Sequence, residues 1–158
     1  MKQLQPAVLV IMLATTVAQG AEVQLICEDK SETAALFRKR APTLGIDVYA
    51  FDSVARTVKQ LDGELKDMKL LSVGVTEAEI RFEQSGYINQ PQITETFQTT
   101  ISRVSGKWVR HPHYVDEQGR WVAGSALEHL ARPLGLWGAF GIRQRPDEGE
   151  CTVDNRKF

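Results

Sequence analysis

Two histidines, His111 and His113, have the spacing in this chain that best suits a metal ion. In an extended chain, residues two apart point to the same side, so both imidazoles could reach one ion. Further ligands would come from side chains nearby in the sequence, namely Asp116, Glu117 and His129. Pro112 between the histidines equally fits a strand end or loop with ordinary exposed histidines. We therefore predict no metal site and no cofactor, and keep this pair as the alternative to check.

The two cysteines, Cys27 and Cys151, stand near the two ends of the chain that follows residue 20. An isolated pair of this kind in an oxidising compartment forms a disulfide. A redox or metal role would call for a C-x-x-C spacing or a nearby histidine, and the sequence has neither. We predict a structural disulfide that joins the first and last strands and closes a loop spanning nearly the whole domain.

Local catalytic motifs are missing from the sequence. It contains no G-x-S-x-G elbow, no phosphate-binding glycine loop and no H-E-x-x-H. The formal net charge is -1, without the basic excess that nucleic-acid binding calls for. Sites assembled from distant strands leave no local motif, so an enzyme stays an alternative. We predict a non-enzymatic protein without a nucleic-acid partner.

Residues 1–20 have the pattern of a secretory signal peptide. Lys2 supplies the positive start, residues 7–17 are apolar, and residues 18–20 are small or polar, as at a cleavage site. The apolar run is shorter than a membrane span requires, and no later stretch reaches that length. We expect residues 21–158 to form a single β-rich domain in the periplasm or outside the cell, without a membrane span after cleavage.

Short segments with period-two alternation, separated by turn residues, predict an all-β fold. We expect an antiparallel meander that closes into a small barrel or sandwich, with one or two short helices. Capping boxes at Asp29 and Ser125 would start the helices. The expected strands are 23–27, 46–51, 56–61, 70–75, 79–83 and 150–153, with hairpins over 97–109 and 114–122 and a loop over 85–92.

The register of the 97–109 hairpin depends on its turn. A turn with Gly106 in the left-handed conformation would pair Ile101 with Val109, which keeps two apolar side chains opposite each other. We predict this register over the two-residue turn, which would place Ile101 opposite Arg110.

The apolar segment 134–142 combines large side chains with three glycines. One interpretation is a loop that plugs an open end of the barrel, since most apolar clusters are core. The other is an exposed docking loop that inserts aromatic side chains into a partner. The residues predicted to dock are Leu136, Trp137, Phe140 and Ile142.

Several short segments form a pattern that spans most of the chain after residue 20. They are Leu25-Ile26-Cys27, Val48-Tyr49-Ala50-Phe51-Asp52, Arg56-Thr57-Val58, Ile101-Ser102-Arg103-Val104-Ser105-Gly106, Gly149-Glu150-Cys151 and the terminal Phe158. On these segments the chain resembles a group of small secreted or periplasmic proteins of Gram-negative bacteria without assigned function. They carry a cysteine near each end and an I-x-R-x-[ST]-G hairpin. The resemblance implies a β-meander and supplies no catalytic residues. Residues 122–145 depart from the pattern.

Three functional hypotheses follow. The leading one is a non-enzymatic binding module of the cell envelope, whose partner is another envelope or extracellular protein. The second is a carrier of a small apolar ligand inside a β-barrel. Its cavity would be lined by Tyr49, Phe82, Phe97, Trp108 and Trp121. The third is an inhibitor of a foreign hydrolase such as lysozyme.

Overall fold

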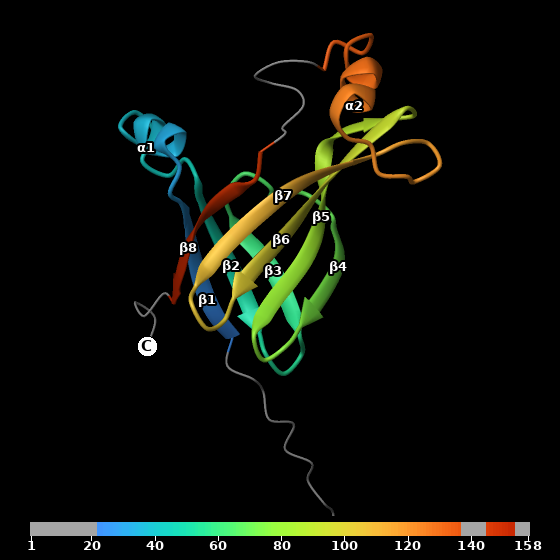
Figure 1. The fold of residues 1–158 in the computed structure, drawn as a ribbon. Helices are drawn as coiled ribbons and strands as arrows, with labels where there is room; N and C mark the ends of the chain where they lie inside the picture. Colours follow the sequence, from blue (N-terminus) through green and yellow to red (C-terminus); the bar gives the residue numbers. More distant parts are fainter. Residues whose placement is uncertain (1–21, 137–144, 154–158) are drawn as a thin grey trace, which may run out of the picture.

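The computed structural model describes residues 22–136 and 145–153, and within them eight antiparallel strands form one nearly closed, barrel-like sheet (Figure 1). Two short helices accompany the sheet, so the predicted all-β fold class is confirmed. The strands are β1 Glu22–Asp29, β2 Ile46–Asp52, β3 Thr57–Asp62, β4 Leu70–Val75, β5 Glu79–Gln90, β6 Ile93–Ser102, β7 Lys107–Val115 and β8 Asp147–Val153. The helices are α1 Glu32–Arg38 and α2 Gly124–Ala131.

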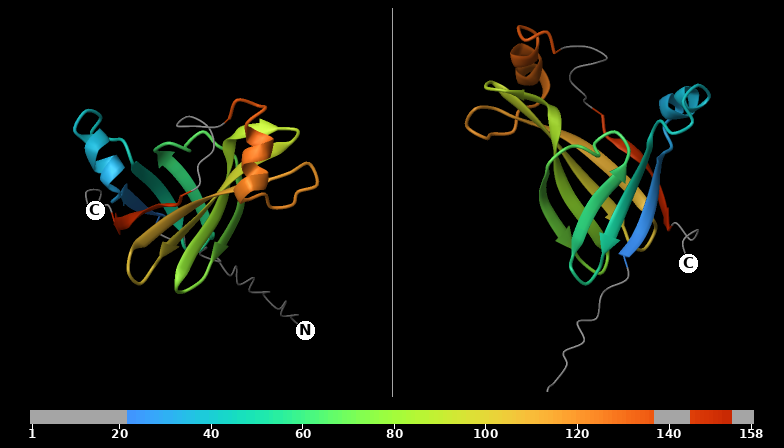
Figure 2. Two further views of the ribbon diagram at one scale, coloured as in Figure 1. Left: turned by 45° about the horizontal axis from the view of Figure 1, so that its top comes forward. Right: turned by 180° about the vertical axis from the view of Figure 1, so that it is seen from behind.

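The sheet closes through its first and last strands. The strand order is β3-β2-β1-β8-β7-β6-β5-β4, so β1 pairs with β8 and the open side lies between β3 and β4. The predicted neighbourhood of the first and last strands is therefore confirmed. Figure 2 shows α1 and α2 on opposite sides of the same end of the sheet, which we call the mouth.

The interior away from the mouth is apolar. Along β6 every second residue is buried, as expected for a strand with one face toward a core. Trp108, Tyr49 and Phe82 are almost completely buried, and the rings of Tyr49 and Phe82 meet edge to face at 5.1 Å. Full burial of one such side chain contributes about 1.5–3 kcal/mol. The cluster contains Cys27, Tyr49, Phe51, Val58, Ile80, Phe82, Ile101 and Trp108.

The predicted register of the β6–β7 hairpin is wrong by one residue. Ile101 pairs with Trp108, not with Val109. Gly106 does adopt a positive φ of 73°, but the turn contains four residues, 103–106. The reason is burial: Trp108 has the larger apolar surface and faces the core with Ile101, whereas Val109 faces outward and is half-buried.

The predicted loop over 85–92 is also wrong, because β5 continues through it to Gln90. Gly86 lies inside this strand, where its role is close packing. A Cβ atom at Gly86 would lie 2.5 Å from the Glu95 side chain. The β5–β6 register shifts between Ser85 and Asn89, and this irregularity lets the strand carry the glycine.

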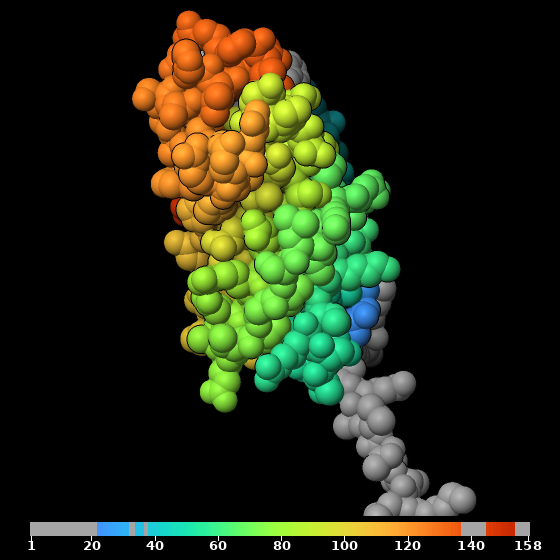
Figure 3. Space-filling model, turned by 90° about the vertical axis from the view of Figure 1, so that its right-hand side faces the viewer, coloured from blue at the N-terminus to red at the C-terminus, as the bar shows by residue number. Residues whose placement is uncertain are grey.

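A second, smaller apolar cluster lies where β5, β6 and β7 extend beyond the mouth. α2 covers these strand ends. In Figure 3 the helix and the loop before it lie at one end of the molecule, against β5 and β6. Leu134 and Leu136 pack against this cluster. The start of 134–142 is therefore core-like, while Trp137, Phe140 and Ile142 lie outside the described residues. The buried members are Ile88, Ile93, Tyr114, Val122 and Leu127.

Neither helix begins with the predicted capping box. Ser31 caps α1 by accepting a hydrogen bond from Ala34 N at 3.1 Å, while Asp29 accepts from Ser31 N. Ala123 is the N-cap of α2 and makes no side-chain cap, so Ser125 lies inside the first turn. Each predicted cap was two residues from the observed one, an error typical of helix ends.

The signal-peptide prediction falls on residues outside those described. Within the described residues, no helix has the length and apolar character needed to cross a membrane.

Cys27 and Cys151 form the predicted disulfide, and they are direct register partners in the β1–β8 ladder. The cross-link joins positions 124 residues apart, and Cys27 is completely buried. The bond therefore connects the two strands whose pairing closes the sheet.

We predict that Cys27→Ser or Cys151→Ser strongly destabilises the protein. A cross-link over a loop of this length contributes on the order of 4–5 kcal/mol through the unfolded-state entropy, out of about 5–15 kcal/mol for a typical domain. Thermal denaturation should show a melting temperature lower by roughly 10 °C or more. The double variant should be no worse than the worse single variant, because each change removes the same bond. Two reactive thiols in freshly isolated wild-type protein would contradict this prediction.

Candidate binding cleft at the mouth of the sheet

A cleft of about 750 Å³ opens at the mouth. Its walls are the start of α1, the connection from α1 to β2, the connection from β3 to β4, and the residues that begin β8. Arg110 on β7 and Asp47 on β2 line it and are only 4% and 2% exposed, so they form its floor.

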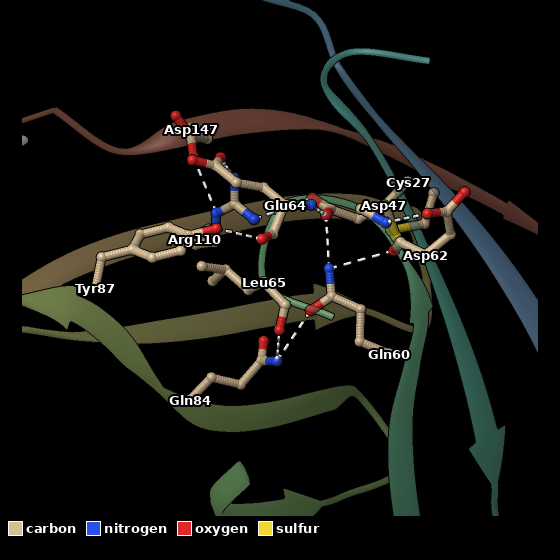
Figure 4. A network of polar contacts seen from close by, with 12 residues as sticks. Cys27, Asp47, Gln60, Asp62, Glu64, Leu65, Gln84, Tyr87, Arg110 and Asp147 are labelled. Carbon is tan, nitrogen blue, oxygen red and sulfur yellow. Dashed lines mark hydrogen bonds and ion pairs between the residues drawn. A yellow bond between two sulfur atoms is a disulfide. The ribbon is translucent and has the colours of Figure 1, made fainter. Parts of the chain in front are cut away.

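The guanidinium of Arg110 is surrounded by three carboxylates (Figure 4). Its Nη1 donates to Asp47 Oδ2 at 3.1 Å. Its Nε and Nη2 both donate to Asp147 Oδ2, at 2.9 and 2.7 Å, and Nη2 also reaches Glu64 Oε2 at 3.3 Å. Charge-assisted hydrogen bonds of this kind are about twice as strong as neutral ones. One side chain thus links β7 to β2, β8 and the β3–β4 connection.

Aromatic rings hold the inner face of the same guanidinium. The Arg110 Cζ atom lies 5.2 Å from the Trp108 ring centroid and 5.6 Å from that of Phe97. Both distances fall within the range of a cation–π interaction. The planar group is therefore fixed by carboxylates on its edges and by rings below it.

Asp47 is the most deeply buried of the carboxylates. Burial raises its pKa above the ordinary 3.8, and the Arg110 charge opposes this shift. Its Oδ1 accepts hydrogen bonds from Gln60 Nε2 at 2.7 Å and Glu64 N at 3.2 Å. Gly63 lies directly against it, since a Cβ there would come within 2.0 Å of Oδ1, and its φ is +114°. Only glycine lets the β3–β4 connection pass this close.

Two glutamines bridge the open side of the sheet below the cleft. Gln84 Nε2 on β5 donates to Gln60 Oε1 on β3 at 2.9 Å and to Leu65 O at 3.2 Å. Leu65 is completely buried, so the β3–β4 connection inserts a side chain into the interior. The open side is thus held by side chains where no strand ladder joins β3 to β4.

Besides His113 Nε2 on β7, four buried side-chain polar atoms have no hydrogen-bond partner within residues 22–136 and 145–153. They are Tyr49 Oη, Gln84 Oε1, Thr99 Oγ1 and Trp108 Nε1. Burial raises the pKa of Tyr49 far above its ordinary value, and the Asp47 charge adds to this shift. The hydroxyl lies near Trp108 and Arg110, but neither contact has hydrogen-bond geometry. Buried polar groups without a hydrogen-bond partner are rare in folded proteins. These four atoms show that polar groups extend from the cleft floor into the interior of the sheet.

The cleft carries an excess of negative charge. Its lining includes five carboxylates and three cations, a formal difference of two negative charges. The carboxylates are Asp29, Asp47, Asp62, Glu64 and Asp147, and the cations are Lys66, Arg110 and Arg145. A cleft lined by one dominant sign of charge concentrates ligands of the opposite sign.

The histidine pair lies elsewhere, on the outer face of β7. His111 and His113 pair with Gln98 and Thr96 of β6, and their ring centroids are 6.4 Å apart. They share a face, as the spacing predicted. Within the described part of the chain, however, no group of three or more His, Cys, Asp or Glu side chains is placed to hold a metal ion.

Sequence reasoning missed the cleft residues because they come from distant parts of the chain. A usable signal existed in the strand alternation: Arg110 shares a face with Trp108, and Asp47 shares a face with Tyr49. Two opposite charges on inward faces of different strands predict a buried ion pair. Glu64 and Asp147 carry no such signal, since they lie in a connection and at a strand start.

Comparison with family models, curated proteins and solved structures finds no match to this chain. The resemblance to small secreted Gram-negative proteins therefore stays a prediction.

We predict that Arg110→Met destabilises the protein by about 3–5 kcal/mol, because Asp47 would stay buried without its counter-charge. The loss should grow with pH. The pKa of the Asp47 carboxyl is higher in the folded state, so the folded state binds its proton more tightly. The contribution of Asp47 to the stability of the fold is therefore complete below pH 3.8 and is lost as pH rises through the raised pKa. Removing Arg110 raises that pKa further. Urea denaturation between pH 3 and 7 measures both effects.

The matched control is Arg120→Met. Arg120 pairs with Asp116 on the surface, and its side chain is 74% exposed. This change should shift stability by less than about 1 kcal/mol. Equal losses in the two variants, or a loss at Arg110 that does not vary with pH, would contradict a buried ionic cluster.

Proposed function

We propose that this protein is a non-enzymatic binding module of the periplasm or the secreted space, and that the cleft at the mouth is its binding site. The bound group belongs to a polar ligand or to another envelope macromolecule. The observation that carries this proposal is the preorganised ionic cluster on the cleft floor.

Preorganisation matters because a binding site gains affinity when its groups need no rearrangement. Arg110 is held by three carboxylates and two rings, and Asp47 by two further hydrogen bonds. Buried ion pairs are weak evidence for stability, since apolar replacements are often neutral or stabilising. A costly, well-ordered cluster that lines an open cleft is better explained by recognition.

The chemistry of the lining favours binding over catalysis. The described residues that line the cleft include no histidine and no cysteine. Ser31 is the single serine among them, and its hydroxyl is engaged as the cap of α1. A serine or cysteine nucleophile beside a histidine base is therefore not among the described residues that line the cleft.

The location rests on two observations. The disulfide fits an oxidising compartment, and residues 1–20 have the signal-peptide pattern. Both support the periplasm or the exterior as the place where the cleft meets its partner.

The carrier and inhibitor alternatives have less support. An apolar carrier needs an apolar mouth, whereas charged residues line this one. Trp121, expected to line the cavity, is 70% exposed. The sequence shows no inhibitory motif that would support an inhibitor of a hydrolase. An inhibitor that inserts a loop into an enzyme needs a convex surface, whereas this site is a concave cleft.

We predict that a photo-crosslinking residue at the cleft captures the partner. Leu44 lines the cleft and is 47% exposed, so p-benzoylphenylalanine at this position leaves the ionic cluster intact. Irradiation in the producing cell should give a discrete adduct that unlabelled wild-type protein suppresses. Denaturing electrophoresis and mass spectrometry identify the adduct.

The control places the same residue at Val104, which is 85% exposed in the β6–β7 turn. This turn lies at the end of the sheet opposite the mouth (Figure 1). The discrete adduct should be absent there. The same adducts at both positions, or none at Leu44, would refute the cleft as the binding site of a macromolecular partner.

A further inference from the structure

We infer that the cleft recognises an organic cation, an ammonium or guanidinium group carried by a small amine or by a basic segment of a partner protein. The inference rests on the proposed function and names the chemistry of the bound group. It follows from the charge of the lining, the orientation of its carboxylates and the unpartnered polar atoms beneath them.

The accessible charge on the cleft floor is negative. The side chains of Asp47 and Arg110 are 3% and 5% exposed, so they are sealed from solvent. The side chains of Glu64 and Asp147 are 38% and 26% exposed. A ligand entering the cleft therefore meets carboxylates first, and the buried cation lies behind them.

The carboxylates of the cleft already bind one guanidinium group, that of Arg110. They are arranged around the N–H groups of Arg110, in the planar geometry that guanidinium recognition requires. Their positions are fixed: Glu64 N donates to Asp47, the Tyr87 hydroxyl donates to Glu64 O, and Asp147 accepts two bonds from Arg110. A second cation beside Arg110 would meet oxygens that need no reorganisation.

An independent observation comes from the layer below. The Tyr49 hydroxyl is completely buried, has no hydrogen-bond partner within the described residues, and lies beside Asp47 and Arg110. Gln84 Oε1 is a second unpartnered acceptor in the same network (Figure 4). Both oxygens can accept hydrogen bonds from N–H groups, whereas the unpartnered Trp108 Nε1 in the same layer can only donate one.

An inorganic divalent ion fits this site poorly. The carboxylates that would coordinate it surround a permanently charged guanidinium, whose repulsion disfavours a second compact positive charge. An organic cation spreads its charge and brings its own directional donors. Calcium is therefore the metal to test against it.

Substitution of Lys66 or Arg145 tests the inference through an expected increase in affinity for the cation. Both are exposed cations on the cleft lining, so they compete with an incoming cation. Removing one should strengthen binding, whereas a variant that merely damaged the fold would weaken it.

The experiment titrates the mature protein at low ionic strength with arginine amide, 1,4-diaminobutane and tetralysine, followed by calorimetry. The negative probe is tetralysine with acetylated side chains, and calcium chloride is the metal arm. We expect binding of the cationic probes that weakens as salt is added. If tetralysine binds at least tenfold more tightly than the small amines, the natural ligand is a basic protein segment. If the small amines bind more tightly than tetralysine, it is a free amine.

Three variants locate the binding. Glu64→Gln should weaken it at least fivefold, and Lys66→Ala should strengthen it about threefold. Lys59→Ala removes an exposed lysine on β3 outside the cleft and should leave the affinity unchanged. Circular dichroism confirms that each variant is folded.

The outcomes separate this inference from the proposed function. A discrete Leu44 adduct without binding of any organic cation would overturn the inference and leave the cleft as a binding site. Calcium binding alone, or equal effects of Lys66→Ala and Lys59→Ala, would also overturn it. Cation binding with no Leu44 adduct would support the inference and refute a macromolecular partner at this site.

Discussion

Arg110 carries a permanent charge inside the sheet, and the mouth of the fold is organised around holding it there. Transfer of a guanidinium from water to a protein interior is unfavourable by several kcal/mol unless carboxylates replace the water. Asp47, Glu64 and Asp147 supply them, each from a different segment. The β3–β4 connection lies over the mouth, where Glu64 pairs with Arg110. In the same connection Leu65 is buried in the interior and Gly63 packs directly against Asp47. One ion cluster thus orders a region that no strand ladder holds.

The two ends of the interior consequently differ in character. Toward the hairpin turns, rings and aliphatic side chains pack around the disulfide strands, and burial of apolar surface stabilises the closed sheet. Toward the mouth, polar groups meet an open cleft. The open side between β3 and β4 is compatible with a stable fold because Gln60 and Gln84 bridge it. Apolar packing and the charged cleft are therefore separated along one axis of the sheet.

This separation explains how a small domain can present a charged cleft without losing its fold. The covalent link between Cys27 and Cys151 and the apolar cluster lie in the body of the sheet, where they tolerate little change. The cleft is built largely from connections, which can vary in length and charge while the strands stay in place. α2 and its own cluster form a separate addition over the ends of β5, β6 and β7.

The sequence by itself determined the fold class, the β1–β8 neighbourhood and the disulfide, because alternation of apolar residues and the pairing of two cysteines are local or compositional signals. Tertiary structure decided the rest. The hairpin register depended on which of two apolar residues, Trp108 or Val109, buries more surface in a core assembled from many strands. The Gly86 segment is a strand because Glu95 packs against it. Arg110 lies 37, 46 and 63 residues from its three carboxylates in the sequence. Coulomb attraction acts on distance in space, which only the closed sheet defines.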